Sequence, residues 1–258
     1  MVKIITVANQ KGGVGKTTTS INLSSALGLA HKNVLLIDLD PQGNATMGSG
    51  IDKHQIVHSV NDVLLGDVLL EDAVLRTHCH YDLLPANADL TVSEVNLLEQ
   101  PDRETFLYRA LKSARSRYNF ILIDCPPSLN ILTINALVAS DSVLIPIQCE
   151  YYALEGLAAL LDTLEQLKQS INPSLAIEGI LRTMFDNRNR LAQEVSSELL
   201  KHFNDKVYRT VIPRNVRLAE APSHGLPILL YDKYSQGAAA YSVLAEEFLK
   251  QQEEHTAS

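Results

Sequence analysis

The sequence predicts an α/β protein in which a doubly wound, mostly parallel sheet carries helices on both faces. Short β-branched, apolar runs alternate with longer amphipathic stretches along the 258 residues. Two of these runs, VLLID at 34–38 and FILID at 120–124, are apolar without alternation, as is typical of parallel strands buried on both faces. Because ligands bind at the carboxyl ends of the strands in such sheets, we expect a site there.

The chain is predicted to form one domain of alternating strands and helices. No repeat and no linker divides the chain, so residues 1–250 are predicted to form one domain and the polar residues 251–258 a frayed tail. A first strand that begins at residue 3 leaves no room for an N-terminal helix-turn-helix module. We expect strands at Lys3–Ala8, Val34–Asp38, Tyr81–Ala86, Phe120–Cys125, Ser142–Ile147, Ile177–Met184 and Val207–Ile212, and helices that include Lys16–Ala30, Arg103–Ser116, Leu154–Ser170 and Leu191–Phe203.

The composition excludes several classes of protein. With 46% hydrophobic and 20% charged residues, the chain is neither disordered nor fibrous. Its three cysteines (Cys79, Cys125 and Cys149) are an odd number without a C-x-x-C pair, which indicates a reduced, intracellular chain. No apolar run reaches the roughly 18–20 residues of a membrane span, and no signal peptide is visible. We therefore expect a cytoplasmic protein.

A glycine-rich loop, QKGGVGKTT at 10–18, lies between the first strand and the first helix. Glycines allow a tight turn that aims backbone N–H groups at phosphate oxygens, and the following helix presents its positive end to the same anion. Lys16 supplies a charge for the β- and γ-phosphates, and the Thr17 hydroxyl is placed to bind Mg²⁺. The alternative is a turn that merely needs glycine. The loop predicts a nucleotide site formed by Lys11, Gly12, Gly13, Val14, Gly15, Lys16, Thr17 and Thr18.

Two later strands end in carboxylates that we expect beside this loop. Asp38 and Asp40 follow the second strand, and either can orient the attacking water in phosphoryl transfer. The alternative for both is a strand-end cap on the turn at Pro41, and we favour Asp40 for hydrolysis. Asp124 ends another apolar strand and is predicted to lie near Mg²⁺, bound through a coordinated water.

Lys11 departs from the general pattern G-x-x-x-x-G-K-[ST], which has glycine where this chain has Gln10. From the loop alone, Lys11 is either a solvated surface lysine or a second cation for phosphate. KGGVGKTT resembles the deviant Walker A motif of the ParA/MinD group of P-loop ATPases. DLDPQGN at 38–44 and PRNVRLAEAPS at 213–223 are similar to further segments of the chromosomal ParA family, and the similarity extends from residue 2 to about 248.

The resemblance implies a P-loop NTPase fold and a DNA-partition ATPase that uses ATP and Mg²⁺. It implies that an ATP-bound homodimer forms, with Lys11 reaching the phosphates of the partner subunit, and that Asp40 is required for hydrolysis. Pro213 and Asn215 would line the adenine site. Arg188 and Arg217 would bind double-stranded DNA without reading its sequence, which places the protein on the nucleoid. A centromere-binding partner resembling ParB would stimulate hydrolysis and release the DNA.

The charge distribution agrees with a DNA site, although the formal net charge is −8. Residues 182–217 contain eight basic and four acidic residues, which leaves 14 basic and 26 acidic in the remainder. A solvated basic face is the alternative.

Two other functions fit the phosphate loop. A MinD-like ATPase acting on the membrane needs a basic amphipathic C-terminal helix, whereas VLAEEFLKQQEEHTAS contains four glutamates that anionic lipid repels, so we expect no membrane binding. A P-loop metabolic ligase has no evident use for the basic segment.

Overall fold

The computed structural model describes residues 2–257, with side chains through residue 254, and its strands form one eight-stranded sheet. The order is β3-β4-β2-β5-β1-β6-β7-β8, and every neighbouring pair is parallel except β3 with β4. The predicted doubly wound, mostly parallel sheet is confirmed, and each predicted strand is present with ends shifted by at most two residues. The strands are β1 (Lys3–Val7), β2 (Val34–Asp38), β3 (Leu75–Arg76), β4 (Asp82–Leu84), β5 (Phe120–Asp124), β6 (Ser142–Gln148), β7 (Ala176–Phe185) and β8 (Val207–Pro213).

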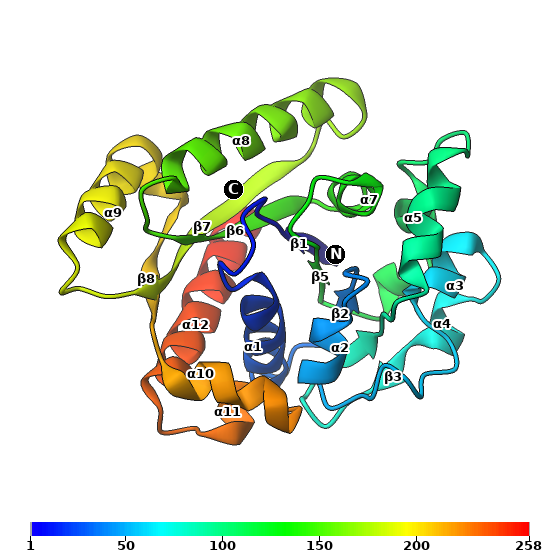
Figure 1. The fold of residues 1–258 in the computed structure, drawn as a ribbon, viewed down its shortest axis with the longest axis horizontal. Coiled ribbons are helices and arrows are strands. Elements are labelled where there is room, and N and C mark those ends of the chain that lie inside the picture. Colours follow the sequence, from blue (N-terminus) through cyan, green and yellow to red (C-terminus); the bar gives the residue numbers. More distant parts are fainter. Residues whose placement is uncertain (1, 258) are drawn as a thin grey trace.

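Helices cover both faces of the sheet (Figure 1), because alternate residues of each strand point to opposite sides. Ile5 packs in the core beneath α1 and α12, whereas Ile4 packs on the other side with the helices from α3 to α7. The α-helices are α1 (Lys16–Leu29), α2 (Asn44–Gly48), α3 (Val60–Leu65), α4 (Leu70–Ala73), α5 (Leu90–Leu98), α6 (Phe106–Ala110), α7 (Ile131–Ala139), α8 (Ala153–Ser170), α9 (Arg190–Phe203), α10 (Val216–Glu220), α11 (Ile228–Tyr231) and α12 (Gln236–Ala257).

The strand register brings the predicted site residues to one edge of the sheet. Val7, the last residue of β1, lies beside Asp124 of β5, and Asp124 in turn lies beside Asp38 of β2. The phosphate loop that follows β1 and the carboxylates that end β2 and β5 therefore meet at the carboxyl edge.

The helix predicted over Arg103–Ser116 is wrong in extent. Only α6 is α-helical there, and Ala114–Ser116 forms a separate 3₁₀ turn. Asn135 of α7 binds this segment from outside: its amide nitrogen donates to the Arg103 carbonyl, and its oxygen accepts from the Leu107 N–H. These contacts replace the first helical hydrogen bonds, so the helix starts late.

The frayed tail predicted at 251–258 is not observed over the part that the structure describes, where α12 continues as a helix to Ala257. Residue 258 lies outside the described residues. Tyr241, Leu244 and Phe248 anchor α12 in the core, and Gln252 donates a hydrogen bond to Glu178. This packing extends the helix through the polar residues. None of the helices within residues 2–257 is long and apolar enough to cross a membrane.

Candidate active site

The glycine-rich loop connects β1 to α1 and turns through backbone conformations that favour glycine. Gly13 has φ of 74° and Gly15 has φ of 87°, a region that side chains disfavour. The Thr183 hydroxyl of β7 donates to the Val14 carbonyl at 2.7 Å, which fixes the loop against the sheet. The loop therefore presents the N-terminus of α1 as a preformed anion site.

Lys16, the first residue of α1, is only 7% exposed. Burial lowers the pKa of its ammonium group, whereas the nearby charges of Asp124 and Asp40 raise it. Its Nζ donates to the Lys11 carbonyl at 3.3 Å, so the side chain folds back over the loop. A positive charge is thus held where the loop would receive phosphate.

Thr17 and Asp124 meet at the base of the loop. The Thr17 hydroxyl donates to Asp124 Oδ2 at 2.8 Å, and the Ser20 hydroxyl lies 2.9 Å from Asp124 Oδ1. Burial, and then the neighbouring Asp38, raise the pKa of Asp124 to about 8. A divalent cation beside this carboxylate would favour its charged form, and hydroxyl and carboxylate oxygens are the ligands that Mg²⁺ prefers.

These two residues fit Mg²⁺ only together with a ligand. Among the described residues, no group of three or more His, Cys, Asp or Glu could hold a metal ion. Mg²⁺ sites commonly combine one or two protein ligands with waters and substrate phosphates, and Thr17 and Asp124 suit such a site.

Asp38 and Asp40 have different surroundings. Asp38 is fully buried, and its Oδ2 accepts from the backbone N–H and the hydroxyl of Thr46 at 2.7 and 2.8 Å. Burial raises the pKa of Asp38 to about 6 even though these bonds lower it. Asp40 accepts one backbone bond from Gln42 at 2.9 Å and lines the cavity next to the loop. Asp38 therefore holds the β2–α2 turn, and Asp40 faces the site.

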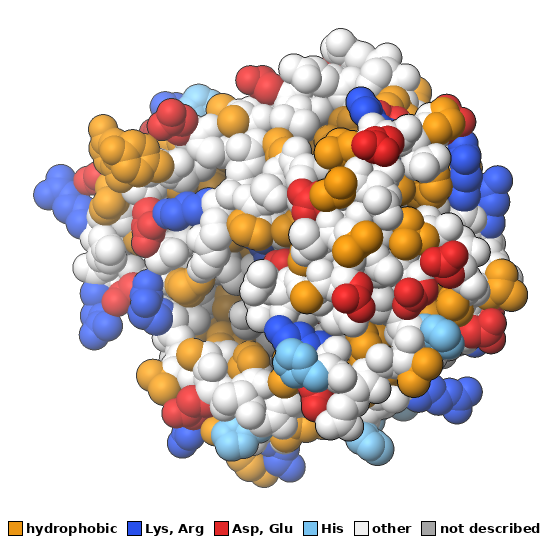
Figure 2. Space-filling view, turned by 45° about the vertical axis from the view of Figure 1, so that its right-hand side comes forward, with side chains coloured by type: hydrophobic (Ala, Val, Ile, Leu, Met, Phe, Trp, Pro, Cys, Tyr) orange, Lys and Arg blue, Asp and Glu red, His pale blue; other side chains and the backbone are white. Residues whose placement is uncertain are grey.

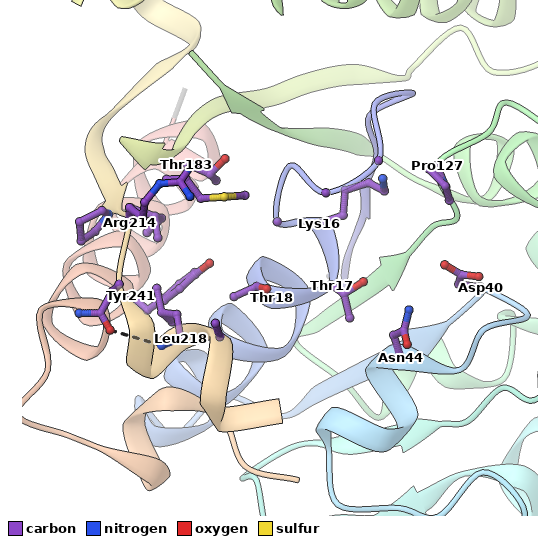
Figure 3. Close-up of a pocket in the computed structure, with 18 of the residues that line it drawn as sticks. Lys16, Thr17, Thr18, Asp40, Asn44, Pro127, Thr183, Arg214, Leu218 and Tyr241 are labelled. Atoms are coloured by element: carbon purple, nitrogen blue, oxygen red, sulfur yellow. Dashed lines mark hydrogen bonds between the residues drawn. The ribbon is translucent and has the colours of Figure 1, made fainter. Parts of the chain in front are cut away.

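A cavity of about 530 Å³ extends from the loop toward α10 and α12, and Figure 3 shows its lining. Lys16, Thr17 and Thr18 lie at its centre, Asp40 and Pro127 at one end, and Arg214 and Tyr241 at the other. The volume suits a nucleotide-sized ligand. Among the residues predicted from the sequence, the lining includes Gly12, Gly13, Gly15, Lys16, Thr17, Thr18, Asp40, Pro213 and Asn215.

Several lining residues were not predicted from the sequence. Arg214 lies between Pro213 and Asn215, and the basic segment that contains it was interpreted only as a surface. Thr183 and Tyr241 come from β7 and α12, and only the folded chain brings them to the loop. Of the predicted nucleotide residues, Lys11 and Val14 are outside the lining.

The Lys11 side chain does not line the cavity of its own chain. Its Nζ lies 2.5 Å from Glu150, which follows β6, and both side chains are exposed to nearly half of their area. Its backbone N–H donates to Asn9 at 2.9 Å, so the loop itself fixes the start of this side chain.

The two arginines predicted to bind DNA are both at the surface. Arg188 precedes α9, is 91% exposed and pairs with Asp186 at 3.0 Å. Arg217 lies on α10 and pairs with Glu220 at 2.8 Å and Asp232 at 3.4 Å. Figure 2 shows Lys and Arg side chains along the left of the view, the side on which Figure 1 places α9 and β8, with carboxylates between them.

The fold and this site define a P-loop ATPase. A family model described as an AAA domain matches residues 2–177. The sporulation initiation inhibitor protein Soj of Bacillus subtilis is 54% identical over 248 residues, covering 96% of this chain and 98% of that protein. The chromosome partitioning protein ParA of Caulobacter vibrioides is 48% identical, covering 99% of this chain and 97% of that protein. The chain therefore belongs to the Soj/ParA family of chromosome-partitioning ATPases.

The fold is also similar to that of a solved structure that contains a nucleotide and magnesium. The crystal structure of cobyrinic acid a,c-diamide synthase from Mycobacterium smegmatis with bound ADP and magnesium superposes with a TM-score of 0.86 and is 38% identical. The similarity covers 98% of this chain and 96% of that one. The P-loop NTPase fold predicted from the sequence is confirmed.

Proposed function

We propose that this chain is an ATP-driven switch for DNA partition: its ATP-bound homodimer binds double-stranded DNA non-specifically, and hydrolysis releases the DNA. Membership of the Soj/ParA family supports the partition role. The observation that carries the switch is the placement of Lys11, a loop lysine held outside the cavity of its own chain.

The reaction is ATP plus water to ADP and phosphate. Lys16 and the backbone N–H groups of the loop stabilise the negative charge of the β- and γ-phosphates. Asp40 faces the same space with one carboxylate oxygen outside its bond to Gln42, and this oxygen accepts a hydrogen bond from the attacking water. Thr17 and Asp124 would hold Mg²⁺, which would supply charge neutralisation when bound.

Lys11 makes dimerisation depend on the nucleotide. Its ammonium group pairs with Glu150 in the single chain and is accessible to a second molecule. In a two-fold symmetric dimer each Lys11 reaches the phosphates bound by the other chain. ATP, with one more phosphate than ADP, offers that lysine more charge, so the dimer forms with ATP and opens after hydrolysis.

DNA binding requires the dimer because each chain offers few cations. Arg188 and Arg217 are exposed, and a dimer doubles the number of phosphate contacts that these two side chains make. Such contacts release counterions, so binding is steeply salt-dependent and tolerant of sequence. In this proposal a ParB-like protein stimulates hydrolysis, and the ATP-bound chain is associated with the nucleoid.

A P-loop metabolic ligase is the second candidate, because the Mycobacterium smegmatis relative bears the name of a synthase. A ligase hydrolyses ATP in step with a small acid acceptor and is indifferent to DNA. The two functions therefore differ in what stimulates ATP turnover.

The test is binding to random-sequence duplex DNA over a range of salt concentrations, with ATP or with ADP. We expect tight binding with ATP only. Arg217→Ala should weaken it, whereas Arg109→Ala, which removes an equally exposed arginine on α6 that pairs with Asp102, should not. Indifference to DNA in both nucleotide states, together with stimulation by a small acid, would contradict the partition proposal and favour the ligase.

A further inference from the structure

A second hollow, of about 400 Å³, lies at the amino ends of β2, β4 and β5, at the opposite edge of the sheet from the nucleotide cavity. Its walls come from the segment between α1 and β2, from β3 and the turn to β4, and from the residues that precede β5. The side chains that decide its chemistry are Lys32, Arg76, His80, Asp82, Arg117 and Tyr118.

The charge of this hollow is opposite to that of the whole chain. Lys32, Arg76 and Arg117 line it and form no ion pair with any described residue, in a protein with a net charge of −8. Asp82 is the one carboxylate in the lining, and it accepts a hydrogen bond from the Tyr118 hydroxyl at 2.9 Å. Three cations therefore face one carboxylate that already has a partner.

Both arginines lie near the hydrogen-bonded pair of Tyr118 and Asp82, and Arg76 is opposite Asp82 in the register of β3 and β4. Burial, and then the hydrogen bond to Asp82, raise the pKa of Tyr118, whereas the charges of Arg117 and Arg76 lower it. The Arg117 guanidinium also lies 5.9 Å from the centroid of the Tyr118 ring. Arg117 is thus close to a buried ring at the wall of the hollow, and Arg76 lies opposite the carboxylate that binds this ring.

The walls are held in place without a ligand. The Thr77 hydroxyl donates to the Tyr81 carbonyl at 2.5 Å and closes the turn that carries His80. That turn lies against α1 at Gly28, where an added Cβ would come within 1.9 Å of the His80 carbonyl oxygen. Glycine is required there because the turn packs directly against the helix. The backbone that carries the cations around this turn is therefore fixed in position.

We propose that this hollow binds a small polyanion bearing phosphate groups, with Arg76 and Arg117 as its main ligands and Lys32 as a third cation. Guanidinium groups form paired, charge-assisted hydrogen bonds with phosphate oxygens, and an anion relieves the mutual repulsion of the three cations. The volume is sufficient for a small phosphorylated molecule. A concave, mostly polar lining suits a compact phosphate chain.

The test measures binding of inorganic pyrophosphate to the full chain by titration calorimetry, in a Lys16→Ala background that removes the main cation of the phosphate loop. We expect saturable binding of one pyrophosphate per chain, weakened about tenfold by Arg117→Gln and by Arg76→Gln. Arg115→Gln is the matched control, because Arg115 is an exposed arginine two residues away that does not line the hollow. Circular dichroism verifies that each variant is folded.

The competing outcomes are distinct. ADP that binds more tightly than pyrophosphate in the same background, and that Arg117→Gln weakens, identifies a nucleotide as the ligand of the hollow. Equal binding of the two, weakened by the same variant, identifies the phosphates alone; both support the proposal. No saturable binding up to about 10 mM pyrophosphate overturns it. An equal loss in Arg115→Gln overturns it too, as does displacement of pyrophosphate by duplex DNA or by polyglutamate at matched charge, which would indicate a macromolecular surface.

Discussion

The polar side chains around the nucleotide cavity differ from the three exposed cations Lys11, Arg188 and Arg217 in how buried their partners are. In the cavity, buried groups from distant elements hold one another, as Thr17 of α1 holds Asp124 of β5 at 2.8 Å. Each exposed cation instead pairs with a carboxylate near it on the surface, such as Arg188 with Asp186. Exposed ion pairs contribute little to stability, roughly 0–1 kcal/mol, so a second molecule can replace them. The comparison teaches that the polar groups around the cavity find their partners within one chain, whereas the exposed cations hold ion pairs that a second macromolecule can replace.

The largest effect is expected at Lys16. Lys16→Ala removes the buried cation that faces the phosphates and should slow ATP hydrolysis by about 10²-fold or more, measured as phosphate release. The melting temperature should not fall, because burial of this charge is itself unfavourable. Lys168→Ala, at an exposed lysine paired with Glu165, is the control. Hydrolysis within tenfold of the unmodified protein would contradict the assignment.

Substitutions at Asp40 and Asp38 should have different effects: one on ATP hydrolysis, the other on the stability of the fold. Asp40→Ala should lower hydrolysis about 10²-fold with little change in melting temperature, because Asp40 accepts only one backbone bond. Asp38→Ala leaves the buried N–H and hydroxyl of Thr46 without their acceptor and should destabilise the fold by about 1–3 kcal/mol. Denaturant unfolding and phosphate release measure the two effects. Equal losses of activity and stability in both variants would contradict the distinction.

A smaller effect is expected at the exposed pair of Lys11 and Glu150. Glu150→Gln removes the carboxylate that competes with a partner's phosphates for Lys11 and should strengthen ATP-dependent dimerisation by up to about fivefold. Sedimentation velocity with ATP measures it, and Glu165→Gln is the matched control. Weaker dimerisation would show that Glu150 supports the dimer instead.

A separate effect is a pH dependence of stability that comes from the two buried carboxylates Asp38 and Asp124. The pKa of Asp38 is raised to about 6 and that of Asp124 to about 8, above their value in the unfolded chain. The folded protein therefore binds more protons than the unfolded one, and these groups make stability fall as pH rises from 4 to 8, by at most about 1.4 kcal/mol per pH unit for each proton. Without nucleotide or Mg²⁺, the free energy of unfolding should decrease from pH 6 to pH 8. Asp124→Asn should flatten that slope, and an unchanged slope would contradict the assignment.

The sequence predicted most of what depends on local patterns. The apolar strands ending at Asp38 and Asp124 fixed the sheet edge, and the glycine loop between β1 and α1 located the cavity. The contribution of Thr183 and Tyr241 could not be predicted, because β7 and α12 meet the loop only through long-range packing. The sequence favoured Asp40 over Asp38, but the physical reason appears only in the structure, where Thr46 donates to Asp38 and Asp40 lines the cavity. The interruption of the Arg103–Ser116 helix likewise depends on Asn135, a residue from another element.

The most direct test of the account is whether Lys11 acts on the nucleotide of the partner chain. Lys11→Ala and Asp40→Ala should each be inactive alone. In their mixed dimer, the Lys11→Ala chain keeps its own Asp40 and receives Lys11 from the other chain, so one of its two sites is complete. Equal mixing should restore about a quarter of the ATPase activity of the unmodified protein, as expected for random pairing in a two-fold dimer. If Lys11 acts within its own chain, no mixed dimer has a complete site, and the mixture will remain inactive.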